Sequence, residues 1–260
     1  MPELNVLLIG DIVGKLGRRT VAAVLPGLRK DLALDLVIAN GENTAGGRGL
    51  TPGKAEELYE AGVDVITSGN HIWENREIYP VLNDPEAPVI RPMNYPDGVP
   101  GRGVHRRDGV AILNAMGRTF MGVNIDDPFR AVDHALKGLA DCRVRILDFH
   151  AEATSEKIAI AYYLDGRVSA VVGTHTHVPT ADTRILPNGT AYVTDLGMCG
   201  ALHSVIGMQT DRVIERFLTA LPNRFDPVEK GPAVFNSVHI TIDKDTGRAL
   251  NIERVDREVA

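Results

Sequence analysis

Short runs of aliphatic and β-branched residues recur along the chain, and polar or glycine-rich residues follow most of them. The runs are "NVLLIGD", "LDLVIAN", "VDVITSGN", "VAIL", "FMGVNID", "VRILDFH", "VSAVVGTH", "AYVTDLG" and "VFNSVHITI". Near-continuous apolar runs of this length are typical of strands that are covered on both faces. The pattern therefore predicts buried β-sheets.

Helix-like segments separate many of these runs. They are clearest at residues 18–31, 52–61, 130–139, 153–164 and 208–220. Pro26 is expected to interrupt or bend the first of them. Thr51 followed by Pro52 is a favourable helix start, because threonine caps the helix and proline suits the first helical position. Strands that alternate with helices indicate an α/β protein.

Some strands come in close pairs that leave no room for a helix between them. In "VAILNAMGRTFMGV" we expect residues 114–118 to connect a hairpin, and residues 244–247 are expected to connect another near the C-terminus. The sheets are therefore expected to be mixed. The C-terminal hairpin would complete a sheet, with an oligomer contact as the alternative. Residues 83–103 are rich in proline and glycine, which predicts a long surface excursion.

The 260 residues suffice for a full hydrophobic core, and no break in composition divides them. We therefore expect a single domain over residues 1–260. With 44% hydrophobic and 24% charged residues, the chain is typical of soluble globular proteins. The first apolar run, residues 4–10, is too short to cross a bilayer and lacks the flanks of a secretory signal. A cytoplasmic location without membrane association is the expectation.

The formal net charge of -6 offers no global attraction for nucleic acid or for an acidic membrane. DNA is not expected as a partner. The densest basic run, "RGVHRRDG" at residues 102–109, predicts a solvated loop, with a phosphate contact as the alternative. Cys142 and Cys199 are far apart and show no CxxC spacing, so we expect two reduced thiols and no structural zinc site.

Side chains that can bind metal follow five of the predicted strands. In α/β proteins, ligands bind beyond the carboxyl ends of the strands. These ends carry Asp11, Glu42, Asn43, Asn70, His71, His150, His175 and His177. Each of them alone has an ordinary alternative, such as capping a helix or holding a turn. Their recurrence at five strand ends indicates one shared site.

The motif "GTHTH" is the strongest local signal. His175 and His177 alternate along an expected extended backbone and would project to one side, where both imidazoles could reach a metal. A cation would also keep the pair neutral, although a metal-free histidine pair is the alternative. Carboxylates, amides and imidazoles without a thiolate suit Mn or Fe, with Zn as a further option. The donors exceed what one ion needs, so they divide between two ions if Glu42 bridges.

Several longer blocks resemble one known family. The blocks "GDIVGKLGR", "NGENTAGGRGLT", "SGNHIWEN", "DFHAEATSEK" and "GTHTHVPTAD" are similar to the YmdB-like branch of the calcineurin-like metallophosphoesterases, and "TDLGMCGALHSVIG" extends the likeness. The resemblance covers nearly the whole chain. It implies a metallophosphoesterase fold: two facing mixed β-sheets flanked by helices, a four-layer α-β-β-α sandwich with a dinuclear metal site.

The resemblance also implies a role for each strand-end residue. By motif position, one ion would be held by Asp11, Glu42, Asn43 and His177, and the other by Glu42, Asn70, His150 and His175. His71 would stay off the metals and act as the catalytic imidazole. Val13 replaces the usual histidine of the superfamily and Glu42 the usual aspartate, as in the YmdB-like branch. Cys199 and Ala201 stand where closer relatives are expected to have threonine and proline.

The activity that this resemblance implies is phosphodiester hydrolysis, with 2',3'-cyclic nucleotides as the best specific substrate. A phosphomonoester, a cyclic dinucleotide or an RNA end could use the same metals. Two cations about 3.5 to 4 Å apart would activate a hydroxide for in-line attack on phosphorus. His71 would protonate the leaving oxygen or stabilise its charge. Arg48 and Trp73 are candidate substrate contacts, with a flexible loop and core packing as their respective alternatives.

Two other functions compete with this hypothesis. A dinuclear amidohydrolase would carry its HxH pair after an early strand of a barrel, whereas here "HTH" comes late and "GNH" precedes it, which favours the phosphoesterase. The other is a non-catalytic regulator that senses a metal or a nucleotide at the same site. The sequence leaves a homo-oligomer open.

Overall fold

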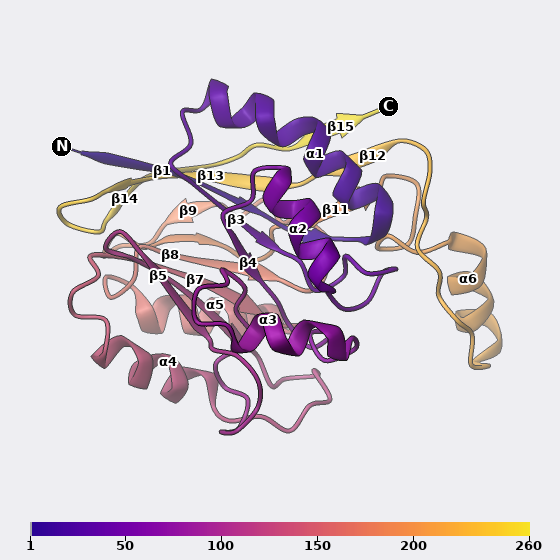
Figure 1. Ribbon diagram of the computed structural model, residues 1–260, viewed down its shortest axis with the longest axis horizontal. Coiled ribbons are helices and arrows are strands. Elements are labelled where there is room, and N and C mark those ends of the chain that lie inside the picture. The colour runs from indigo at the N-terminus through magenta and orange to yellow at the C-terminus, as the bar shows by residue number, and fades with distance from the viewer. Residues whose placement is uncertain (1) are drawn as a thin grey trace.

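Two β-sheets pack face to face in the computed structural model, which describes residues 2–260 (Figure 1). The first sheet has the order β14-β13-β1-β3-β4 and consists of β1 (Glu3–Ile9), β3 (Leu36–Asn40), β4 (Val65–Thr67), β13 (Ser237–Asp243) and β14 (Ala249–Arg254). The strand β1 runs parallel to β3 and antiparallel to β13. This sheet is therefore mixed, as predicted.

The second sheet has the order β5-β6-β7-β8-β10-β9. Its strands are β5 (Val104–Arg107), β6 (Val110–Met116), β7 (Val144–His150), β8 (Ala170–Thr174), β9 (Arg184–Ile185) and β10 (Ala191–Val193). A small third sheet has the order β15-β12-β11-β2 and contains β2 (Asp11–Ile12), β11 (Met198–Ala201), β12 (Ala233–Phe235) and β15 (Arg257–Val259). The small sheet was not predicted.

Helices cover the two outer faces (Figure 1). The helices α1 (Gly14–Asp31) and α2 (Pro52–Glu60) pack on the first sheet, and α4 (Pro128–Lys137) and α5 (Thr154–Leu164) pack on the second. The short η1 (Arg76–Ile78) and α3 (Tyr79–Asn83) follow β4, and α6 (Thr210–Thr219) lies at the edge of the molecule. The helix ends agree with the predicted bounds to within a few residues, but Pro26 does not interrupt α1 as it was expected to.

The side chains of one strand alternate between two hydrophobic layers. In β1, Leu7 and Ile9 face α1 and α2, whereas Val6 and Leu8 join the core between the two sheets. The same alternation in β7 divides its residues between the intersheet core and the helices α4 and α5. Because both faces are covered, the strands read as continuous apolar runs. The metallophosphoesterase sandwich that the resemblance implied is confirmed.

The expected hairpin at residues 114–118 is wrong. The strand β6 continues through Asn114 to Met116 and pairs in parallel with β7, and residues 117–125 form no strand. The hairpin instead joins β5 to β6 through Asp108 and Gly109, whose φ angles of 50° and 78° suit a tight turn. The basic segment at residues 102–109 is thus largely an edge strand and not a loop.

The expected surface excursion at residues 83–103 is wrong in its middle. Ile66 in β4 donates its N–H to Pro88 O at 2.8 Å, and Ile90 donates to Ile66 O at 2.9 Å. Val89 and Ile90 are fully buried. The segment therefore extends the pairing at the edge of the first sheet, although its flanks are exposed.

Two other predictions concern the C-terminal hairpin and the cysteines. The strands β13 and β14 form the hairpin that residues 244–247 were expected to connect. Within residues 2–260, Cys142 and Cys199 are buried and unpaired, as predicted. Across the same described residues, no helix is both long and apolar enough to cross a membrane.

Candidate metal centre

All of the strand-end donors lie at one edge of the sandwich. Asp11 follows β1, Glu42 and Asn43 follow β3, and Asn70 and His71 follow β4; from the second sheet, His150 ends β7, and His175 and His177 follow β8. The parallel pairing of β1 with β3, of β3 with β4 and of β7 with β8 brings these carboxyl ends together. Both sheets thus contribute to the site.

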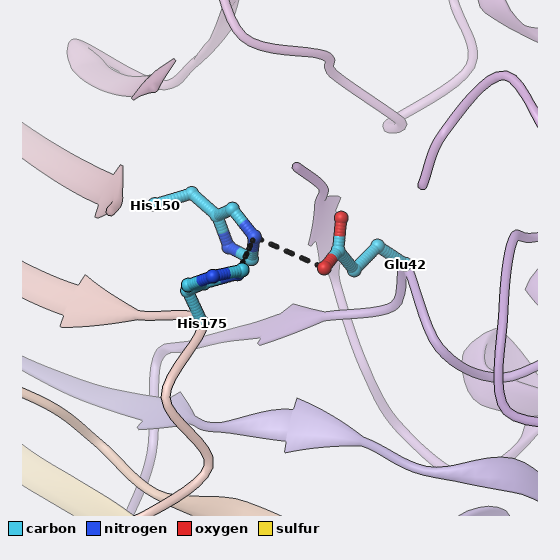
Figure 2. A group of neighbouring side chains, drawn as sticks. All are labelled: Glu42, His150 and His175. Atoms are coloured by element: carbon cyan, nitrogen blue, oxygen red, sulfur yellow. Dashed lines mark hydrogen bonds and ion pairs between the residues drawn. The ribbon is translucent and has the colours of Figure 1, made fainter. Parts of the chain in front are cut away.

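One group of donors surrounds His150, and Figure 2 shows two of its members, Glu42 and His175. His150 Nε2 lies 3.0 Å from Glu42 Oε1, 3.1 Å from Asn70 Oδ1 and 3.1 Å from His175 Nδ1. Donor atoms of Glu42, His150 and His175 all lie within 4.8 Å of one another. Nitrogen and oxygen donors therefore converge within the reach of one ion.

A second group surrounds His177. His177 Nε2 lies 3.1 Å from Asn43 Nδ2 and 3.7 Å from Asp11 Oδ1. Asn43 Nδ2 is also 3.4 Å from Glu42 Oε1, the same oxygen that contacts His150. A half-turn of the Asn43 amide would exchange Nδ2 for the metal-binding Oδ1. Glu42 thus connects the two groups.

Two features of this site fit bound cations. Asp11 is fully buried, and within the described part of the chain its Oδ1 has no hydrogen-bond partner. A buried carboxylate oxygen without a partner is costly unless a cation neutralises it. At Gly69, a Cβ atom would lie 2.2 Å from His150 Cδ2 and 2.5 Å from Glu42 Oε2, so only glycine leaves room for the donors. The residues fit divalent metal ions.

Burial and neighbouring charges shift the pKa values of the donors in this site. Although burial opposes both charges, the pKa of Glu42 is lowered to about 2 by the positive charge of His150, and the pKa of His150 is raised to about 9 by Glu42. Burial and the charge of His150 lower the pKa of His175 to about 3. Burial raises the pKa of Asp11 to about 6. A cation would replace the proton on His150.

The extended backbone that we expected through "GTHTH" is wrong. The strand β8 ends at Thr174, and His175 and His177 have φ angles of 103° and 65°, which non-glycine residues rarely adopt. The two imidazoles consequently reach different groups, His175 beside His150 and His177 beside Asn43. Strained backbone of this kind is common at functional sites.

A buried ion pair holds this turn. Thr176, between the two histidines, donates its N–H and its hydroxyl to Asp195 Oδ2 at 3.1 and 2.7 Å. Lys157 Nζ lies 2.7 Å from the same oxygen, and both charged side chains are 1% exposed. Because three donors share one buried carboxylate oxygen, the local backbone is firmly constrained.

Each histidine also contacts a group on the side away from the other donors. His150 Nδ1 lies 2.9 Å from Thr174 Oγ1, His175 Nε2 lies 3.2 Å from Glu152 Oε2, and His177 Nδ1 donates to Ile206 O at 2.9 Å. Such contacts orient imidazoles that bind metal. Sequence analysis missed these three partners. Thr174 and Glu152 stand within the blocks that were singled out, whereas Ile206 acts through its backbone and gives no signal.

The ring of His71 lies outside the Glu42–His150–His175 cluster. Its Nδ1 lies 3.2 Å from Glu74 Oε1, and its backbone N–H donates to Glu42 Oε2 at 3.0 Å. Sequence analysis also missed Glu74, three residues further along "SGNHIWEN". The pair of His71 and Glu74 has the geometry of an acid–base imidazole oriented by a carboxylate.

The two candidate substrate contacts differ in their surroundings. Trp73 packs edge to face against Tyr79 and Tyr95, with ring centroids 5.8 and 5.2 Å apart, and contacts the core beneath α1 and α2. This packing favours the structural alternative. Arg48 is exposed in the glycine-rich turn after Asn43, where Gly47 and Gly49 have positive φ angles.

Comparison with known proteins gives consistent matches over the whole chain. A family model described as YmdB-like protein matches residues 7–255. The 2',3'-cyclic-nucleotide 2'-phosphodiesterase of Bacillus subtilis (strain 168) is 46% identical over 257 residues, which are 97% of this chain and 96% of that protein.

Two crystal structures are similar to this chain over nearly its full length. A hypothetical protein from Thermus thermophilus is 44% identical with a TM-score of 0.91, over 99% of this chain and 100% of the other. A novel phosphatase from Mycoplasma pneumoniae is 36% identical with a TM-score of 0.93, over 99% and 94%.

Proposed function

Because the chain belongs to the family of YmdB-like proteins, we propose that it is a metal-dependent phosphodiesterase that hydrolyses 2',3'-cyclic nucleotides. The observation that carries the proposal is the convergence of two donor groups on Glu42 Oε1, which lies 3.0 Å from His150 Nε2 and 3.4 Å from Asn43 Nδ2. A shared carboxylate between two groups of nitrogen and oxygen donors is suited to a pair of ions.

The proposed ligands fall into two sets, which correspond to the donor groups around His177 and His150. One ion would be held by Asp11, Glu42, Asn43 and His177, and the other by Glu42, Asn70, His150 and His175. Iron and manganese suit these donors best, with zinc as the next choice, because the set combines carboxylates, amides and imidazoles without a thiolate. When bound, the ions would supply Lewis acidity, neutralise the phosphate charge and lower the pKa of the attacking water.

His71 is the proposed general acid. Glu74 accepts a hydrogen bond from Nδ1–H of His71 at 3.2 Å, which leaves Nε2 to carry the proton for the substrate. Hydrolysis breaks the bond between phosphorus and the ribose 2' oxygen, adds the oxygen of water to phosphorus and returns a proton to the 2' oxygen. Because a ribose alkoxide is a poor leaving group, this proton transfer contributes most to the hydrolysis of 2',3'-cyclic nucleotides.

The proposed substrate is a small nucleotide. An RNA end that carries the same phosphodiester is the larger alternative. Arg48, exposed at the glycine-rich turn, is the proposed phosphate contact. Because donors from both sheets form one site, we also propose that residues 1–260 act as one domain.

The test is hydrolysis of 2',3'-cyclic AMP by metal-stripped protein before and after the addition of Mn²⁺, with separation of the products. We expect 3'-AMP to form only with metal. Full occupancy by two metals with binding but no turnover of the cyclic nucleotide would favour a sensing regulator. Turnover of phosphomonoesters alone would reassign the substrate class.

A further inference from the structure

We propose that Asp148 is a positioning residue of the metal centre: acting through Thr174, it holds the imidazole of His150 in the tautomer whose Nε2 can bind a metal. This proposal rests on the proposed function. It concerns a residue that neither binds the substrate nor belongs to the proposed ligand set.

The carboxylate of Asp148 is 3% exposed and accepts three hydrogen bonds. Thr174 Oγ1 donates to Oδ1 at 2.7 Å, Asn40 Nδ2 donates to Oδ2 at 3.2 Å, and the Thr67 hydroxyl also donates to Oδ2. The three donors are themselves fully or almost fully buried. A buried carboxylate with this many donors is held in one orientation.

The direction of these bonds determines the tautomer of His150. A threonine hydroxyl has one proton, and Thr174 gives it to Asp148. Thr174 Oγ1 therefore presents a lone pair to His150 Nδ1, 2.9 Å away. It can only accept a hydrogen bond from that nitrogen. His150 must then carry a proton on Nδ1, so that once a metal displaces the second proton, the lone pair of Nε2 points toward Glu42 and Asn70.

An amide at position 148 could reverse this chain of bonds. Asparagine can donate an N–H to Thr174 Oγ1, and the hydroxyl proton would then turn toward His150 Nδ1. Nδ1 would have to accept, and the hydrogen of the neutral ring would move to Nε2. The ring would occupy the same place but could not bind a metal through Nε2.

The same carboxylate connects β7 to the ends of three other strands beneath the site. Asp148 lies in β7, and its donors end β3, β4 and β8. Asn40 also accepts from the backbone N–H of Glu42 at 3.2 Å, and Thr67 and Thr174 precede the segments that carry Asn70 and His175. Asp148 thus links both sheets directly behind the donors. The outer partner of His175, by contrast, is the half-exposed Glu152.

The test measures Mn²⁺ binding to folded protein by competition with a chromophoric chelator, without any substrate. Thr174→Val keeps the shape of the side chain and removes the hydroxyl, and we expect it to weaken one of the two sites by about 10- to 100-fold. Thr174→Ser keeps the hydroxyl and is expected to restore binding to within about threefold of the wild type. Asp148→Asn is expected to weaken binding like Thr174→Val.

Thr190→Val is the matched control. Thr190 is also fully buried, and its hydroxyl donates to Val168 O at 2.7 Å and accepts from Gly166 N–H at 2.9 Å. We expect this variant to lose stability but to keep the wild-type affinity for Mn²⁺. Wild-type affinity in Thr174→Val, or an equal loss in Thr190→Val, would overturn the proposal.

The tautomer itself provides a readout that a structural role would not change. Spectra of metal-free, histidine-selectively ¹⁵N-labelled protein, recorded above about pH 9 where His150 is neutral, should show its single ring proton on Nδ1 in the wild type and in Thr174→Ser, but not exclusively in Thr174→Val. Should Asp148→Asn fail to fold, the Thr174 variants still decide the question. If Thr174→Val loses Mn²⁺ affinity and the wild type has no phosphodiesterase activity, this inference stands and the proposed function is rejected.

Discussion

Glu42 and His150 meet across the two sheets, with Oε1 of the carboxylate 3.0 Å from Nε2 of the imidazole and neither side chain more than 2% exposed. The two residues come from β-strand ends of different sheets, β3 and β7. A buried pair of this kind is costly to form and is retained where it serves a purpose beyond stability. In the proposed metal centre, Glu42 and His150 would be ligands of the same ion.

Replacement of Glu42 should remove the connection between the two donor groups. Glu42→Gln keeps the shape of the side chain but loses the charge that two cations share, so we expect fewer than two metals per chain and a loss of hydrolysis of about 100-fold or more. Elemental analysis of the purified protein and product formation from 2',3'-cyclic AMP check both effects. Glu253→Gln, at an exposed carboxylate beside His239, which is not a proposed ligand, is the control and should retain both metals.

A methyl group at position 69 should displace the donors. The added Cβ of Gly69→Ala would overlap His150 and Glu42, so we expect weakened metal binding and loss of hydrolysis. Gly53→Ala is the matched control, because in α2 no atom lies within 4 Å of its added Cβ, and it should stabilise the protein by about 0.5 to 1 kcal/mol. Full activity in Gly69→Ala would mean that the donor cluster lies elsewhere than the proposed site.

His71 should matter most when the leaving group is poor. We expect His71→Ala to reduce kcat for 2',3'-cyclic AMP by about 10²- to 10⁴-fold while the metal content stays the same. The loss should be much smaller for bis(p-nitrophenyl) phosphate, whose leaving group needs no proton. Glu74→Gln should give a milder loss with the same dependence on the leaving group, because the ring would be less well oriented. Equal losses on both substrates would remove His71 from the role of acid.

His105 should make stability depend on pH. Burial and the neighbouring Arg102, whose Nη2 lies 3.2 Å from Nδ1, lower the pKa of His105 in the folded protein. As pH falls through the ordinary value of about 6.5, the unfolded chain binds the proton and the folded protein does not, so stability present at higher pH is lost.

The variant His105→Gln should reduce this loss. We expect a smaller fall in Tm than in the wild type between about pH 7.5 and about pH 5.5. Parallel thermal unfolding of the two proteins, both stripped of metal, measures the difference. The same comparison on His134→Gln, an exposed histidine of α4, controls for removing an imidazole. An unchanged fall in His105→Gln would show that His105 does not contribute.

Local sequence patterns predicted the layers and the strand ends well. The alternation of Val6 and Leu8 with Leu7 and Ile9 buries both faces of β1, and this produces the continuous apolar run from which a covered strand was inferred. The wrong hairpin arose because a polar residue was taken for a turn. Asn114 lies inside β6 because its amide is used internally, accepting from Ser68 N–H at 3.1 Å.

The identity of the donors at the strand ends could be read from local sequence, because each follows directly on an apolar run that the hydrophobic effect buries. How these donors meet depends on tertiary packing. The packing of two sheets brings Glu42 to His150 and Asn40 to Asp148, a non-local event that no short window encodes. The turn at His175 likewise depends on Asp11 and Asp195, which other strands supply. Hydrogen bonds between distant strand ends therefore set the geometry of the centre, whereas the local pattern set its composition.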